Sequence, residues 1–187
     1  MSRKRATWLT IGGVLVVALV AGLALFQPWL LFVDKTADES DDPAAVVGTA
    51  PGGIADTDVP SASAGTKTRV VLATADLIDG EHGTSGVATV YRRSDGTRYL
   101  RLDDLDTSNG PDLHVWLSDR PSGGDCAGCR DSWGIYDDGD YVRLGELKGN
   151  QGSQSYEIPA SADLSAMRSV VIWCDRFNVA FGTAPLA

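Results

Sequence analysis

Hydrophobic residues follow two different patterns along the chain. Residues 8–33 are almost continuously apolar, whereas after residue 66 apolar residues occur in short runs separated by Gly, Asp, Asn, Ser and Pro. A helix over the first stretch would be about 39 Å long, which exceeds the roughly 30 Å of a bilayer core. The first pattern therefore predicts one transmembrane helix, and the second predicts a domain of short β-strands.

The short runs are rich in β-branched, aromatic and leucine residues. They read TRVVLATA, GVATVYR, TRYLRLDD, DLHVWLS, DYVRLGEL, SQSYEIP, SVVIWCD and FNVAFG. Between the second and the third run, Asp95-Gly96 predicts a tight hairpin turn with positive φ angles. The spacing of the runs predicts an all-β domain, either an antiparallel β-sandwich or a partly closed barrel.

Alternation within the runs predicts which side chains share one face of a strand. In DLHVWLS the two faces carry Leu113, Val115 and Leu117, and Asp112, His114, Trp116 and Ser118. In SVVIWCD they carry Val170, Ile172 and Cys174, and Val171, Trp173 and Asp175. In FNVAFG one face is expected to carry Phe177, Val179 and Phe181.

The apolar stretch also predicts the orientation of the chain. Residues 1–7 contain three basic side chains and are expected to lie in the cytoplasm, so everything after Val33 is expected outside. The alternative is a cleaved signal peptide, with Gly22 and Ala24 as the small residues before the cleavage site. The apolar run continues beyond that point and exceeds the usual length of a signal peptide core, which favours an uncleaved anchor over residues 8–33.

Composition defines the segment between the anchor and the domain. Residues 34–65 are mainly Ala, Gly, Pro, Ser, Thr and Asp, which bury too little apolar surface to offset the entropy of ordering. We therefore predict a flexible linker there and a single domain over residues 66–187. The formal net charge of −9 argues against nucleic acid and anionic lipid as partners.

Cys126 and Cys129 form a Cys-x-x-Cys sequence in a glycine-rich loop. Covalent c-type haem attachment needs His after the second cysteine, where this chain has Arg130. A thioredoxin-like dithiol needs a βαβ context, which the loop lacks. In an oxidising compartment the simplest interpretation is a local disulfide between these two residues.

A zinc site is the alternative for the same loop. It would need two further ligands, which only Cys174, His82 and His114 could supply, and thiolate zinc sites are uncommon outside the cytoplasm. We predict no metal site. If the loop cysteines pair with each other, Cys174 is left as a free cysteine, which is most often a small buried hydrophobe and less often a redox group.

Four motifs together resemble a known family. HGTSGVATVY, LDTSNGPDLHVWLS, LGELKGNQGSQSYEIP and SVVIWCDRFNVAFGTAPL occur in the order seen in the DM-thirteen electron-transfer domain, which accompanies DOMON domains in Skeletor-type proteins. The resemblance covers Thr68 to Leu186. It implies a β-sandwich whose characteristic cysteine is Cys174, acting in redox chemistry as a free thiol or as a ligand to a group such as haem. It implies no second ligand, so His114 remains a geometric alternative.

These observations predict a membrane-anchored extracytoplasmic domain that resembles an electron-transfer module. We expect Cys174 to be its redox residue, with an unidentified redox or cell-envelope partner and no defined catalytic activity. The cofactor is unknown, haem being the group that the resemblance suggests. The alternative is a non-catalytic binding module at the cell surface, because the sequence contains no recognisable acid–base pair or metal motif.

Overall fold

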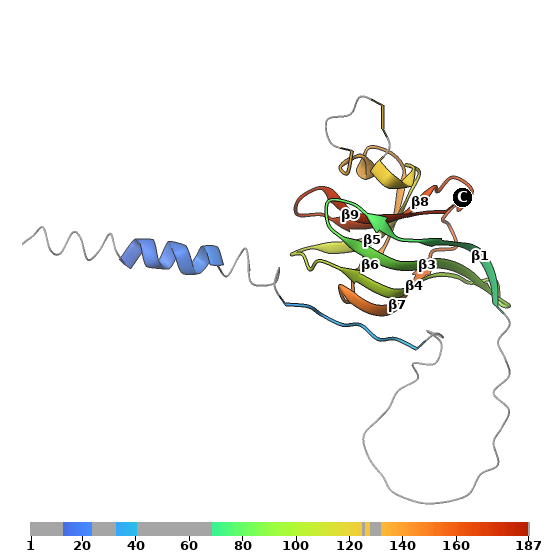
Figure 1. Ribbon diagram of the computed structural model, residues 1–187, viewed down its shortest axis with the longest axis horizontal. Helices are drawn as coiled ribbons and strands as arrows, with labels where there is room; N and C mark the ends of the chain where they lie inside the picture. Colours follow the sequence, from blue (N-terminus) through green and yellow to red (C-terminus); the bar gives the residue numbers. More distant parts are fainter. Residues whose placement is uncertain (1–12, 24–32, 41–68, 125, 128–131, 187) are drawn as a thin grey trace, which may run out of the picture.

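The domain is a sandwich of two antiparallel sheets (Figure 1). The computed structural model describes residues 13–23, 33–40, 69–124, 126–127 and 132–186. One sheet has the order β1 (Arg69–Asp76), β3 (Thr84–Arg93), β4 (Arg98–Thr107) and β7 (Gln151–Ile158). The other has the order β2 (Ile78–Asp79), β9 (Val179–Pro185), β8 (Ser169–Cys174), β5 (Leu113–Ser118) and β6 (Tyr141–Glu146). The predicted sandwich is confirmed, and the barrel alternative is wrong because no strand ladder among the described residues joins the two sheets.

The main hydrophobic core fills the space between the sheets. The five-stranded sheet contributes the alternate residues Leu113, Val115, Leu117, Val170, Ile172, Cys174, Val179 and Phe181. The four-stranded sheet contributes Ala88, Val90, Leu100, Leu102, Leu105, Tyr156 and Ile158. The predicted alternation along DLHVWLS and SVVIWCD is therefore confirmed, since a period of two puts one set of side chains in the core.

One residue of the predicted FNVAFG strand departs from that pattern. Val179 and Phe181 are in the core, whereas Phe177 is 60% exposed in the turn before β9. Asn178 has a φ of 56°, a left-handed conformation that asparagine tolerates and that interrupts an extended strand. The prediction that Phe177 shares the face of Val179 is wrong for this reason.

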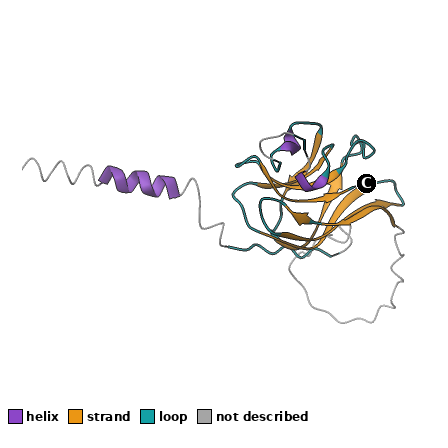
Figure 2. Ribbon diagram, turned by 45° about the horizontal axis from the view of Figure 1, so that its top comes forward, coloured by secondary structure: helices purple, strands orange, loops and turns teal. Residues whose placement is uncertain are grey.

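The hairpin predicted at Asp95-Gly96 joins β3 to β4, in a domain that consists mainly of strands and loops (Figure 2). Gly96 has a φ of 88°, but Asp95 is not in the left-handed region, so the prediction of positive φ at both residues is wrong. The Asp95 carboxylate accepts hydrogen bonds from the backbone N–H and the hydroxyl of Thr97, at 2.8 and 2.6 Å. This local bonding fixes a turn that needs a positive φ only at the glycine.

A second hydrophobic cluster lies on the outer face of the five-stranded sheet. Its buried members are Trp116, Ile135, Tyr136, Val171, Trp173 and Ala180, with Cys126 and Trp133 packed against them. The segment between β5 and β6, which includes the 3₁₀ helices η3 (Ser122–Gly124) and η4 (Ile135–Asp137), supplies the cover. Both faces of β8 are therefore buried, which explains its continuous apolar sequence.

Residues 13–23 form a helix (Figure 1). Within the described ranges, no helix combines the length and the apolar character that crossing a membrane requires. The remainder of the predicted span, residues 8–12 and 24–32, lies outside the described residues. The transmembrane anchor over residues 8–33 therefore stays a prediction.

Residues 33–40, here called the strap, run alongside β7 and form one parallel β-bridge with it, between Thr36 and Gln151 (Figure 1). The Ala37 N–H donates to the Gln151 carbonyl at 2.8 Å, and the Glu39 N–H donates to the Ser153 carbonyl at 2.8 Å. The edge of the four-stranded sheet is thus covered by a segment that precedes it in sequence by more than a hundred residues.

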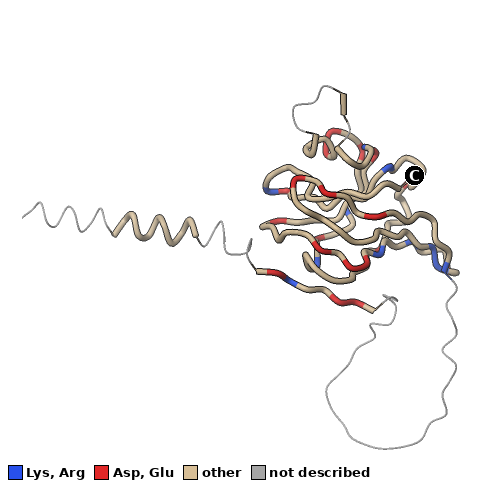
Figure 3. Tube along the Cα trace, in the orientation of Figure 1, with Lys and Arg blue, Asp and Glu red and all other residues tan. Residues whose placement is uncertain are grey.

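Side chains of the domain also hold the strap, whose charged residues are visible in Figure 3. Arg101, which is 4% exposed, donates to the Glu39 and Ser40 carbonyls at 2.8 and 3.2 Å. The buried Asn150 accepts the Lys35 N–H at 2.7 Å. The predicted linker over residues 34–65 therefore begins with a segment bound to the domain, while its residues 41–65 lie outside the described part.

The Glu39 carboxylate of the strap forms an ion pair with Lys148. Burial alone would raise its pKa, but the Lys148 ammonium at 2.7 Å and the Ser155 N–H at 2.8 Å hold the pKa below its ordinary value. A lowered folded-state pKa means stability that is present above the unfolded-state pKa and is lost as the pH falls through the folded-state value.

A Glu39→Gln variant is therefore expected to be less stable than the wild type at pH 7, with the two unfolding free energies converging below about pH 4. Urea denaturation across this pH range measures the difference. In a Lys148→Met background the pH-dependent part of the stability difference should be smaller, because Glu39 then lacks its main ionic partner. A stability difference independent of pH would contradict the assignment.

Candidate functional site

Cys174 is the last residue of β8 and is 0% exposed. It pairs with Leu113 of β5 and with Val179 of β9, and its side chain belongs to the core between the sheets. It is a free cysteine. The residue singled out from the sequence is thus a packed core residue at the end of a central strand.

The surroundings of the sulfur determine its protonation state. Burial raises the pKa of the Cys174 thiol, and the nearby Asp112 carboxylate adds to the rise. The backbone N–H groups of Phe177 and Arg176 point at the sulfur and offset part of this effect. Because an ordinary cysteine already has a pKa of about 8.5, Cys174 is a neutral thiol at pH 7.

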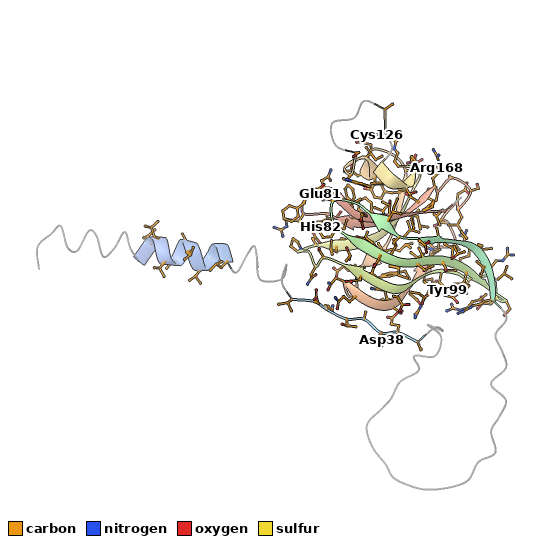
Figure 4. The ribbon with its side chains drawn as sticks, in the orientation of Figure 1. Asp38, Glu81, His82, Tyr99, Cys126 and Arg168 are labelled. Carbon is orange, nitrogen blue, oxygen red and sulfur yellow. The ribbon has the colours of Figure 1, made fainter. Side chains whose placement is uncertain are left out.

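The two histidines do not pair with Cys174. His114 lies opposite Trp173 in the β5–β8 ladder and therefore points to the other face of the sheet from Cys174. His82 lies at one end of the sandwich (Figure 4), where its ring stacks on Phe181 with centroids 3.8 Å apart. The geometric alternative of a Cys174–His114 pair is wrong because alternation puts the two side chains on opposite faces.

The same geometry excludes Cys174 as a ligand of a zinc site at Cys126. Cys126 packs against the outer cluster, in the loop farthest from the four-stranded sheet (Figure 4), whereas Cys174 is in the inner core. The thickness of the five-stranded sheet separates them, so they cannot share a tetrahedral ion. Cys129 lies outside the described residues, so the Cys126–Cys129 disulfide stays a prediction.

Haem, the cofactor suggested by the resemblance, does not fit at Cys174. An axial ligand needs an open direction from the sulfur toward a flat macrocycle, but this side chain has no exposed surface. Its ladder partners Leu113 and Val179 lie beside it, and all three residues belong to the packed core between the sheets. No step of the chemistry is therefore assigned to haem.

Three aromatic rings form a stack on the outer face of the five-stranded sheet, and a fourth ring meets one end of the stack edge-on. The ring centroids of Trp173 and Trp116 are 4.8 Å apart, and those of Trp116 and Tyr141 are 4.4 Å apart. Tyr136 meets Trp173 edge-on at 6.5 Å. The Arg143 guanidinium lies 4.7 Å from the centre of the Trp116 ring, an arrangement that the ring quadrupole favours.

An ionic cluster adjoins this stack at the start of β5 and the end of β8. His114 Nε2 lies 2.9 Å from Asp112 Oδ1 and 3.3 Å from Asp175 Oδ2. Arg143 donates to both oxygens of Asp175, at 2.7 and 3.1 Å. The Asp175 N–H donates to the Asp112 carbonyl at 3.0 Å, which fixes the two aspartate-bearing segments to each other.

The sequence pattern did not predict this cluster, although it predicted the strand face of each of its residues. Alternation had already put Asp112 and His114 on one strand face, and Asp175 on the same face as Trp173. Alternation within a strand does not show that β5 pairs with β8, with Leu113 opposite Cys174. That register brings Asp175 to His114.

Comparison with known proteins identifies the family. The family model described as Electron transfer DM13 matches residues 76–186, more than half of the chain and nearly all of the sandwich. No curated protein and no solved structure matches the chain significantly. The chain therefore belongs to the electron-transfer DM13 family.

Proposed function

We propose that the protein is a membrane-anchored, extracytoplasmic module that exchanges electrons with a redox partner. The observation that carries the proposal is the match of the electron-transfer family over residues 76–186. The apolar run over residues 8–33, preceded by basic residues 1–7, supports anchoring with the sandwich outside. A disulfide between Cys126 and Cys129 would suit that compartment and forms part of the proposal.

Cys174 is the proposed redox residue of this module. Its support is its position in the WCDRFNVAFG motif together with its state as a free cysteine. Its burial separates it from solvent oxidants and alkylating reagents, so the protein is expected to restrict which partner oxidises the sulfur. The backbone N–H groups of Arg176 and Phe177 favour negative charge on the sulfur, as outer hydrogen bonds do at metal-bound thiolates.

The burial of Cys174 also supports a second candidate function, a non-catalytic binding module in which this residue only fills the core. The two functions differ in the number of electrons that the folded chain can release. An electron-transfer residue must release an electron in the folded protein, whereas a core residue contributes to stability alone.

The test is an oxidative titration of the full-length chain. If residues 8–33 anchor the chain, it should stay in the membrane fraction after an alkaline wash, and it is purified from that fraction. The wild type is expected to release one more electron per chain than Cys174→Ala to hexachloroiridate(IV), a strong outer-sphere oxidant that need not touch the sulfur. The electron leaves the Cys174 thiol, its proton passes to solvent, and the product is a thiyl radical. The Cys126→Ala/Cys129→Ala double variant is expected to match the wild type. Alkylation of Cys174 should require unfolding, because the neutral thiol is buried.

A different result would exclude a redox role for Cys174. If Cys174→Ala releases as many electrons as the wild type and loses only about 1 kcal/mol of stability, the cost of a small core deletion, then Cys174 has no redox role. The absorbance spectrum of the same preparation is the second readout. A featureless spectrum with that result would favour the binding module.

A further inference from the structure

The cluster of Asp112, His114 and Asp175 contains an unusual imidazole contact. The same nitrogen, Nε2 of His114, faces one oxygen of each aspartate, at 2.9 and 3.3 Å. A single N–H can point along only one of these directions, and hydrogen bonds weaken steeply away from linearity. One imidazole nitrogen between two carboxylates is better satisfied by a cation that all three groups share.

The spacing of these atoms suits a first-row metal ion. Imidazole nitrogen and carboxylate oxygen lie about 2.0–2.2 Å from such an ion, so neighbouring ligand atoms are separated by about 3 Å. The nitrogen-to-oxygen distances at His114 agree with that separation, and the three ligand atoms all lie within 4.8 Å of one another. Only small side-chain movements would be needed to complete coordination.

The surroundings add outer contacts and an entry path. Arg143 binds both oxygens of Asp175 and so orients that carboxylate, as hydrogen-bond partners commonly do at metal ligands. The side chains of His114 and Asp175 are 14% and 22% exposed, while Asp112 is 44% exposed. The site is therefore open to solvent on the Asp112 side.

We propose that Asp112, His114 and Asp175 bind a divalent transition-metal ion, with Cu²⁺ and Zn²⁺ as the ions that an imidazole and two carboxylates suit. With a neutral imidazole, the two carboxylates and the Arg143 guanidinium leave a net negative charge that a dication reverses. His114 lies on the opposite face of the sheet from Cys174, and the proposal does not depend on the redox role of that residue.

Copper binding by the full-length chain, purified without a histidine tag, tests the proposal. The wild type is expected to bind one Cu²⁺ per chain, with an electron paramagnetic resonance signal split by one imidazole nitrogen. The chain has two histidines, which gives a matched pair of variants. Because even outer-shell changes weaken metal binding by about 10–100-fold, His114→Gln should weaken it at least about 100-fold, and His82→Gln should not.

A second pair of variants separates binding from folding. Asp112→Asn changes the most exposed ligand and should weaken copper binding while the melting temperature of the metal-free chain stays near the wild-type value. Asp106→Asn, outside the cluster, should leave binding unchanged. Equal binding by the wild type and His114→Gln, or a signal without imidazole nitrogen splitting, would overturn the proposal and leave the cluster as an ion-pair network.

Discussion

Replacing Gly152 by alanine is expected to release the strap and to lower the free energy of unfolding by about 2–4 kcal/mol. Gly152 has a φ of 92°, which L side chains rarely adopt. A Cβ atom there would collide with the carbonyl oxygen of Ala37 in the strap. Expulsion of the strap would also leave the guanidinium of Arg101 and the amide of Asn150 without their strap partners.

Gly96→Ala is the matched control for this variant. Gly96 has a similar φ of 88°, but nothing lies within 4 Å of the position of its added Cβ. The control therefore carries only the backbone strain, about 1 kcal/mol. The excess loss in Gly152→Ala, measured by urea denaturation of the full chain, reports the strap itself.

Amide hydrogen exchange provides an independent measurement. In the wild type the N–H groups of Ala37 and Glu39 donate to β7, so both should exchange slowly. Both should exchange rapidly in Gly152→Ala and remain protected in Gly96→Ala. Equal stability losses in the two variants, with both amides still protected, would show that the strap stays bound in Gly152→Ala and would contradict the prediction.

Trp173→Ala is expected to cost about 3–5 kcal/mol, the range for removing a fully buried large side chain. Trp173 has 0% exposure and packs between the rings of Trp116 and Tyr136. Its loss opens a cavity under the segment that covers the outer face of the five-stranded sheet. Thermal and chemical denaturation measure the loss, and the fluorescence of the remaining tryptophans should change as this segment loosens.

Phe177→Ala is the control on the same β8–β9 hairpin. Phe177 is 60% exposed, so its removal should change stability by no more than about 0.5 kcal/mol. A loss for Trp173→Ala as small as that of Phe177→Ala would mean that the outer cluster does not stabilise the domain.

The strap changes the boundary of the folded unit. Arg101, Asn150 and the β7 edge take some of their hydrogen-bond partners from residues 33–40. A fragment beginning at residue 66 would expose that edge, which is a template for pairing with other chains. The chain is better studied at full length, because the strap then covers the edge.

The burial of Cys174 distinguishes it from a reactive surface cysteine. A reactive surface cysteine has a lowered pKa and partial exposure, whereas Cys174 has a raised pKa and no exposure. The same strand carries Trp173 toward the aromatic stack on its other face. Redox chemistry in this protein therefore has to be tested on the folded chain with a defined oxidant.

Features that depend on the local period of side chains could be predicted from the sequence. A repeat of two along DLHVWLS and SVVIWCD predicted the core-facing residues, including Cys174, because strand side chains alternate regardless of which strands pair. It also predicted the hairpin at Gly96 and the all-β class. It did not predict that Phe177 leaves the strand, because the left-handed conformation of Asn178 depends on the turn that the paired strands impose.

Contacts between segments far apart in the sequence became visible only in the folded structure. The linker-like composition of residues 34–40 did not predict their pairing with the domain, since their partners on β7 and at Arg101 and Asn150 are remote in sequence. The approach of Asp175 to His114 likewise depends on the β5–β8 register. Sheet neighbours are selected by the packing of the whole core, so a period within one strand contains no information about them.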